Sequence, residues 1–257
     1  QGTDSWSSGQ VLVRQNKAFK DLARPTWKDL DVPERVIVSS VAGVDYDKSV
    51  RTWVKRRWKV SPEFLQPQAM QCGVTNSYKE PGRLGSDRWA SLIAAHDEYQ
   101  RPVVITDCGT AITVDALDAD GRHLGGLIAP GLELMSASLA GNAPGIEMVD
   151  KESSDIPLLG GSTEVGVTGG VLYAATSFVD RVCSDLKMEL GRNTQVLITG
   201  GDAERIKPLL SNQPLFDADL VLKGLAVFAR ATAPDLESES ESGDERDVAV
   251  EAAVCDS

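Results

Sequence analysis

Histidine is scarce in this sequence of 257 residues, which contains only two, and its four cysteines lie far apart. Cys72, Cys108, Cys183 and Cys255 show no Cys-x-x-Cys spacing, so a zinc site is not expected. The sequence has no apolar run of about 18 residues, the length that a membrane-spanning helix needs. Its first ten residues lack the profile of a signal peptide. These absences favour a cytoplasmic protein that does not enter a membrane.

Basic residues are a minority, with 26 Lys and Arg against 38 Asp and Glu, for a formal net charge of −12. Nine acidic residues and one basic residue lie between Asp235 and Ser257. This composition predicts that 234–257 is a disordered acidic tail. An acidic chain without a long basic stripe is not expected to bind nucleic acid.

Hydrophobic periodicity predicts helices and strands that alternate along the chain. The predicted strands are 35–43, 102–107, 111–118 and 123–131, with an Asp-Gly hairpin turn at 118–123. The predicted helices are 50–58, 84–99, 132–139 and 163–190, the last ending at Gly191. A loop is expected at 141–161, a strand, glycine turn and helix at 194–210, and a short strand with a terminal helix at 218–231. The pattern predicts an α/β protein with a mixed sheet.

The stretch VVITDCGTAITVD, residues 103–115, ends a buried strand in a carboxylate and a glycine turn. Without a side chain at Gly109, backbone N–H groups can approach an anionic oxygen. Thr110 can add a hydroxyl donor, and Asp107 can hold a cation that neutralises phosphate charge. A plain hairpin turn explains the same residues. Cys108 is interpreted as a small turn residue rather than a nucleophile.

A second glycine turn lies in VLITGGDAERI, residues 196–206. Gly200 and Gly201 leave room for a phosphate or a planar group beside bare backbone. The alternative is an ordinary connection to a helix capped by Asp202.

The segment NSYKEPGRLGSDRWASL, residues 76–92, passes from a loop into a helix. Asp87 is either a first-turn acid favoured by the helix dipole or the acceptor of a substrate proton. Arg88 can fix an anionic group of the substrate. Tyr78 can bind substrate through its hydroxyl or lie half-buried.

The glycines of GGSTE, residues 160–164, precede the longest predicted helix. Ser162 or Thr163 can cap that helix, or Thr163 can donate to a ligand carboxylate at the same helix end.

The order of these motifs is more specific than any one of them. GSDRW, VVITDCGTAITVD, HLGGLIAPGLELM, GGSTEVGVTGGVLYA, ITGGDA and LVLKGLA follow one another between about residues 35 and 230. In this order they closely resemble the type III pantothenate kinase family, which includes proteins named Bvg accessory factor. The resemblance implies the actin-like ATPase fold, with two ribonuclease H-like lobes at 1–100 and 101–233.

The resemblance also implies the site. Asp87 would accept the proton of the pantothenate hydroxyl, and the substrate would contact the family positions Tyr78, Gly85, Ser86, Arg88 and Thr163. Asp107 would bind potassium or ammonium, Gly109 and Thr110 would contact the phosphates of magnesium-ATP, and Gly200 and Gly201 match the adenosine motif. A homodimer with pantothenate near the subunit interface is expected.

The family's first phosphate loop, a strand ending in Asp-x-Gly-Asn, has no counterpart upstream of Val36. Because that loop supplies part of the polar shell around the transferred phosphoryl group, reduced activity is one expectation. The edge of the following strand, Ser8–Val13, would also be exposed. The alternatives to an active pantothenate kinase are a non-catalytic regulatory protein and a different small-molecule kinase of the superfamily.

Overall fold

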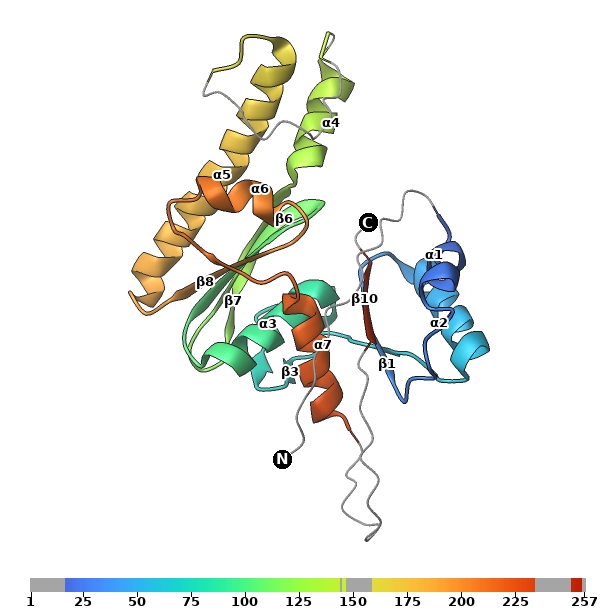
Figure 1. The fold of residues 1–257 in the computed structure, drawn as a ribbon. Helices are drawn as coiled ribbons and strands as arrows, with labels where there is room; N and C mark the ends of the chain where they lie inside the picture. The colour runs from blue at the N-terminus through green and yellow to red at the C-terminus, as the bar shows by residue number, and fades with distance from the viewer. Residues whose placement is uncertain (1–16, 144, 147–158, 234–250, 256–257) are drawn as a thin grey trace. The chain divides into compact units, whose positions relative to one another are not determined.

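The protein forms two compact units in a computed structural model (Figure 1). The structure describes residues 17–143, 145–146, 159–233 and 251–255. The first unit contains the described residues up to Gly73, those from Tyr78 to Asp97, and those from Asp219 onward. The second contains 74–77 and 98–218. The predicted division into 1–100 and 101–233 therefore needs correction, because the last helix returns to the first unit.

A parallel sheet of order β10-β1-β2 runs through the first unit, with β1 at Val36–Ser40, β2 at Glu63–Phe64 and β10 at Glu251–Cys255. Helices α1 (Phe19–Thr26) and α2 (Val44–Trp58) share a buried apolar core with β1. Its aromatic members make tilted and edge-on ring contacts, which involve Phe19, Trp27, Tyr46, Trp53 and Trp58. The sequence patterns did not indicate α1, and they placed the start of α2 six residues late, at Val50 instead of Val44.

The sequence predicts that the whole acidic tail is disordered, but part of this tail forms a strand. Strand β10 comes from that tail and pairs in parallel with β1, from Val36 opposite Glu251 to Ser40 opposite Cys255. The residues from 234 to 250, and the predicted edge strand Ser8–Val13, lie outside the described residues. The short segment EAAVC has few strong strand formers, and its pairing depends on the partner that β1 offers.

Two further helices of the first unit, α3 (Ser86–Tyr99) and α7 (Leu220–Ala231), pack closely. A Cβ atom on Gly224 would lie 1.9 Å from the carbonyl oxygen of Ala90, so α7 needs a glycine where it meets α3. The remaining short elements of this unit are β3 (Met70–Gln71) and the 3-10 turn η1 (Pro81–Arg83).

The second unit is built on a five-stranded mixed sheet, which confirms the predicted fold class. Its order is β7-β6-β5-β8-β9, with antiparallel pairing among the first three strands and parallel pairing from β5 to β9. The strands are β5 (Val103–Cys108), β6 (Ala111–Leu117), β7 (His123–Pro130), β8 (Gln195–Thr199) and β9 (Leu215–Phe216). A short strand, β4 (Val74–Thr75), also belongs to this unit.

Further helical elements accompany this sheet, and α4, α5 and α6 contribute residues to its apolar core. They are α4 (Leu132–Asn142), α5 (Thr163–Leu190), α6 (Ala203–Ile206) and the 3-10 turn η2 (Lys207–Leu209). The predicted bounds of α5 are confirmed, with Gly191 following at a φ of 99°. The short strand predicted at the start of 218–231 is wrong, because β9 lies earlier and α7 begins at Leu220. Within the described residues, no helix has the length and apolar character needed to cross a membrane.

Replacing Gly224 with alanine is expected to lower the free energy of unfolding by about 3 kcal/mol, because the new methyl group would overlap the Ala90 backbone. Gly141→Ala is the control, since a Cβ there meets nothing within 4 Å. The control should change stability by less than about 1 kcal/mol, toward the stabilising side. Urea denaturation followed by circular dichroism measures both. Equal stabilities of the two variants would contradict a tight contact between α3 and α7.

Candidate active site

The GSDR segment lies where α3 begins. The carbonyl of Gly85 accepts the first helical hydrogen bond, from the Trp89 N–H at 3.0 Å, which places Asp87 in the first turn. Asp87 Oδ1 accepts the Arg88 N–H at 2.7 Å. A Cβ on Gly85 would approach this carboxylate oxygen to 2.5 Å, so glycine is the residue that leaves the carboxylate room. Among the described residues, no hydrogen bond to the second carboxylate oxygen, Oδ2, is found, so this oxygen can still accept one.

Ser86 ties the start of α3 to the end of β1. Its buried hydroxyl lies 2.9 Å from Ser39 Oγ, accepts the Ser40 N–H at 3.0 Å and lies 3.1 Å from the Ser40 carbonyl oxygen. Ser40 in turn donates its own hydroxyl to Asp47 of α2 at 2.5 Å. The Ser86 hydroxyl is therefore engaged inside the protein and positions Asp87. Its contact with pantothenate stays a prediction.

Arg88 and Tyr78 form a second pair in the same unit. The guanidinium Nη1 donates to the Tyr78 hydroxyl at 3.1 Å, and its central carbon lies 6.0 Å from the Tyr78 ring centroid. Arg88 is buried with 7% of its surface exposed, an unusual environment for a cation. This arrangement holds the guanidinium in one orientation, suited to a carboxylate or another anionic group.

The Asp107 carboxylate lies at the end of β5, opposite Thr199 of β8. The next residue after β8, Gly200, has a φ of +95°, and a Cβ there would lie 2.4 Å from Asp107 Oδ1 and 2.6 Å from the Cys108 backbone. The Asp202 N–H donates to the Cys108 carbonyl at 2.8 Å. The two predicted turns therefore meet, and Gly200 is required both by its backbone angle and by this approach.

A third turn, which the sequence reasoning missed, joins them. Gly131 follows β7, and its N–H donates to the Thr110 carbonyl at 2.9 Å. A Cβ on Gly131 would lie 2.2 Å from the Gly109 carbonyl oxygen. The signal was present as the last residue of HLGGLIAPG, 123–131, but only the sheet register shows that this glycine returns to the Asp107 turn.

Open backbone, a hydroxyl and carboxylates lie together at the Asp107 turn. A Cβ on Gly201 would meet nothing within 4 Å, so the backbone there is open to a ligand. Thr110 is exposed and Asp107 half-buried. Asp202, a carboxylate absent from the predicted set, lies at the same turn and binds Arg205 Nη1 at 3.0 Å. Within the described part of the chain no three His, Cys, Asp or Glu side chains form a metal cluster, so a cation at Asp107 would need other oxygen ligands.

Thr163 lies apart from this turn, at the first position of α5. Ser162 caps the helix by accepting the Val165 N–H at 3.4 Å, which resolves which hydroxyl serves as the cap. Thr163 instead lines a groove of about 570 Å³ between α4 and α5. The groove is mainly apolar, and its other lining residues include Pro130, Leu134, Met135, Leu139, Val167 and Val171.

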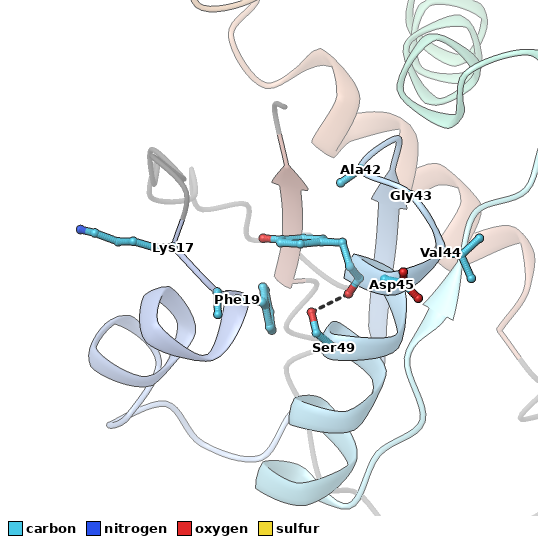
Figure 2. Close-up of a pocket in the computed structure, with 9 residues that line it drawn as sticks. Lys17, Phe19, Ala42, Gly43, Val44, Asp45 and Ser49 are labelled. Atoms are coloured by element: carbon cyan, nitrogen blue, oxygen red, sulfur yellow. Dashed lines mark hydrogen bonds between the residues drawn. The ribbon is translucent and has the colours of Figure 1, made fainter.

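A second cavity, of about 400 Å³, lies in the first unit beside the start of α2 (Figure 2). It is lined by Lys17, Phe19, Asp45, Tyr46 and Ser49, among others, and Ser49 donates its hydroxyl to the Tyr46 carbonyl at 2.6 Å. No residue of the predicted site lines it. Its carboxylate, Asp45, is exposed and pairs with Lys48 at 2.9 Å.

The predicted site residues thus form two groups and one separate residue. The first unit holds the proposed substrate residues Tyr78, Gly85, Ser86, Asp87 and Arg88. The second unit holds the proposed phosphate and cation residues Asp107, Gly109, Thr110, Gly200 and Gly201, with Thr163 in the α4–α5 groove.

The family model and the sequence relatives agree on one family. A family model described as type III pantothenate kinase matches residues 3–185. A type III pantothenate kinase from Nitrosococcus oceani is 39% identical over 227 residues, which cover 86% of this chain and 85% of that protein. One from Nitrosospira multiformis is 36% identical over 217 residues, covering 84% and 79%. A solved structure from Campylobacter jejuni, whose description names the Baf family, has a TM-score of 0.54 at 17% identity. It covers 81% of this chain and 87% of that one and shows the fold alone.

The prediction that Cys108 is a turn residue is wrong, because it is the buried last residue of β5, and its thiol is expected to be unreactive although Asp107 lies next to it. Burial raises its pKa well above the ordinary value, and the charges of Asp107 and Asp202 raise it further. Burial also raises the pKa of Cys183 to about 11. Both thiols therefore stay protonated at pH 8, where nucleophilic thiolate would be needed.

Mass spectrometry after brief iodoacetamide treatment at pH 8 tests this expectation. The native protein should carry little label on Cys108 and Cys183, while the same protein in urea should be labelled on both. Rapid labelling of native Cys108 would contradict a buried, protonated thiol at this position.

Proposed function

This chain belongs to the type III pantothenate kinase family, and we propose that it phosphorylates the primary hydroxyl of pantothenate with ATP, giving 4′-phosphopantothenate. That reaction is the first step of coenzyme A biosynthesis, and the proposal places it in the cytoplasm. The α/β architecture with a mixed sheet agrees with the actin-like ATPase fold of the family. The observation that carries the proposal is the first turn of α3, where an available Asp87 oxygen lies beside the buried Arg88–Tyr78 pair.

Asp87 is proposed to accept the hydroxyl proton as the substrate oxygen bonds to the γ-phosphorus of ATP. The bond from that phosphorus to the β–γ bridging oxygen breaks, and ADP leaves. Arg88 and Tyr78 orient pantothenate, whose carboxylate is a natural partner for a guanidinium. Phosphoryl transfer depends mainly on positioning and charge stabilisation, so fixing these groups is the main contribution of this part of the protein.

The Asp107 turn is proposed to hold the phosphate end of ATP. Thr110 would offer its hydroxyl, and Gly109, whose own N–H donates to the Ala111 carbonyl at 3.1 Å, would let the turn lie close to the phosphates. Gly200 and Gly201 would lie toward the adenosine. Asp107 would bind a monovalent cation, potassium or ammonium, and ATP would carry Mg²⁺. The cations would supply positive charge to offset that of the phosphates. The open backbone at Gly201 and the carboxylate at the end of β5 support these assignments.

A homodimer is proposed from the family and from the apolar surface of the second unit. Leu134 and Leu139 line the α4–α5 groove and are exposed, and Leu127 of β7 and Tyr173 of α5 are further exposed hydrophobic side chains of this unit. An apolar area of this kind is typical of a surface that another chain covers. Thr163, at its edge, would then lie near the subunit interface.

Asp87→Asn is expected to lower kcat for pantothenate phosphorylation by a factor of about 10² to 10⁴, because the amide cannot accept the proton. The measurement is ADP release with magnesium-ATP, with and without pantothenate, in potassium and then in sodium. Pantothenate-dependent turnover that is faster in potassium supports the proposal.

Asp97→Asn is the matched control, since Asp97 lies near the other end of α3 and pairs with Arg230 at 3.3 Å. It should keep turnover within about twofold. Retention of full turnover in Asp87→Asn would refute the role of Asp87. If the unmodified chain shows no turnover, a variant with an added family-like first strand distinguishes a kinase from a regulatory protein. A kinase should gain activity in this variant, and a regulatory protein should not.

Leu134→Glu is expected to convert the dimer into a monomer, because it places a charge in the apolar groove. Leu209→Glu, at an exposed leucine of η2, serves as the control and should stay dimeric. Sedimentation velocity distinguishes the two states. A monomeric unmodified protein, or a dimeric Leu134→Glu variant, would refute this interface.

A further inference from the structure

A buried histidine in the second unit has partners on both ring nitrogens. His123 Nε2 lies 2.8 Å from Asp115 Oδ1, and His123 Nδ1 lies 3.1 Å from Ser77 Oγ. The side chains of His123 and Asp115 are 0% and 4% exposed. None of these three residues has a part in the proposed chemistry, although the group accounts for one of only two histidines in the chain.

Three elements bring these residues together. Asp115 lies on β6 and His123 begins β7, beside a register irregularity between Ala116 and Leu117. Ser77 belongs to the short segment 74–77, which is separated in sequence from the rest of the second unit. A donor–acceptor chain thus runs from the buried Asp115 and His123 side chains to the exposed Ser77.

The backbone of the same segment is attached to the same hairpin. The Thr75 N–H donates to the Gly121 carbonyl at 2.9 Å, and Thr75 forms an isolated parallel bridge with Arg122. Val74 is fully buried. Thr75 and Ser77 therefore both attach this segment to the β6–β7 hairpin, the first through its backbone and the second through its side chain.

The residue after Ser77 is Tyr78, whose hydroxyl accepts the Arg88 hydrogen bond. We propose that the Asp115–His123 pair anchors Ser77 and thereby positions Tyr78, which makes Ser77 and His123 positioning residues for pantothenate. The inference rests on the proposed function, in which Tyr78 and Arg88 orient that substrate. Ser77 is joined to Tyr78 by one peptide bond, so freedom at Ser77 becomes freedom of the tyrosine backbone.

Chemistry explains why the anchor is specific. A carboxylate accepts the Nε2–H of a neutral imidazole, which leaves Nδ1 as an acceptor for the hydroxyl of Ser77. Asp115 therefore selects the tautomer that Ser77 can bind. Activation of Ser77 as a nucleophile fits less well, because serine hydrolases place the carboxylate on Nδ1 and the serine on Nε2, the reverse of this order.

The test compares Ser77→Ala with Ser77→Thr, which keeps the hydroxyl, and with Ser49→Ala, a matched control on α2. Hydrogen exchange of the peptide covering 74–79 should be faster by about tenfold in Ser77→Ala alone. In the same variant the KM for pantothenate should rise by about tenfold, with KM for ATP within about twofold of the unmodified protein. Ser77→Thr should restore both values.

A double variant identifies the route. In a Tyr78→Phe background, which lacks the hydroxyl that Arg88 binds, Ser77→Ala should raise the pantothenate KM by less than twofold, because coupled residues are not additive. A full tenfold effect in that background would overturn positioning through Tyr78. Unchanged hydrogen exchange in Ser77→Ala would overturn the anchor itself. If exchange rises in a protein that does not phosphorylate pantothenate, the anchor stands and the proposed function fails.

Discussion

The buried hydroxyl of Ser86 is the contact on which the proposed substrate site depends. It links the start of α3 to Ser39 and Ser40 at the end of β1, residues 46 and more positions away in the sequence. A buried hydroxyl is costly unless it is bonded, so the two elements gain most when they meet in this one register. Asp87 is the next residue after Ser86, so the hydrogen bonds of Ser86 also fix where the Asp87 backbone lies.

In the second unit, turns are held close together by glycines, which have no side chain. At Gly200 and Gly131 a Cβ atom would overlap the backbone of the Asp107–Thr110 turn, so three turns approach more closely than any other residue would permit. The N–H groups of Gly109, Gly131 and Asp202 bond to backbone carbonyls there, which fixes the turns around the Asp107 carboxylate. Polar donors held in place in this way need little reorganisation when charge moves, which is what phosphoryl transfer requires.

Local patterns predicted the elements whose signals lie within one segment. The long α5 between Ser162 and Gly191 and the hairpin turn at Asp118 are such cases, and in the latter the carboxylate accepts N–H groups of Asp120 and Arg122. Strand β10 was missed because its acidic surroundings resemble a disordered tail, and it is a strand only by pairing with β1. The return of α7 to the first unit was also missed, because the need for a glycine at position 224 arises only from its close contact with Ala90.

At the candidate site, too, sequence motifs alone do not predict what each residue contacts. Sequence motifs grouped Gly85, Ser86, Asp87 and Arg88 as residues that touch a ligand, yet the structure gives them different tasks. Gly85 makes space, Ser86 bonds within the protein, and Arg88 is oriented by Tyr78. A motif therefore records which residues a site needs, while only packing separates those that meet the substrate from those that hold them. Ser77 and His123 belong to the second kind and carry no motif, because their partners come from three separate segments.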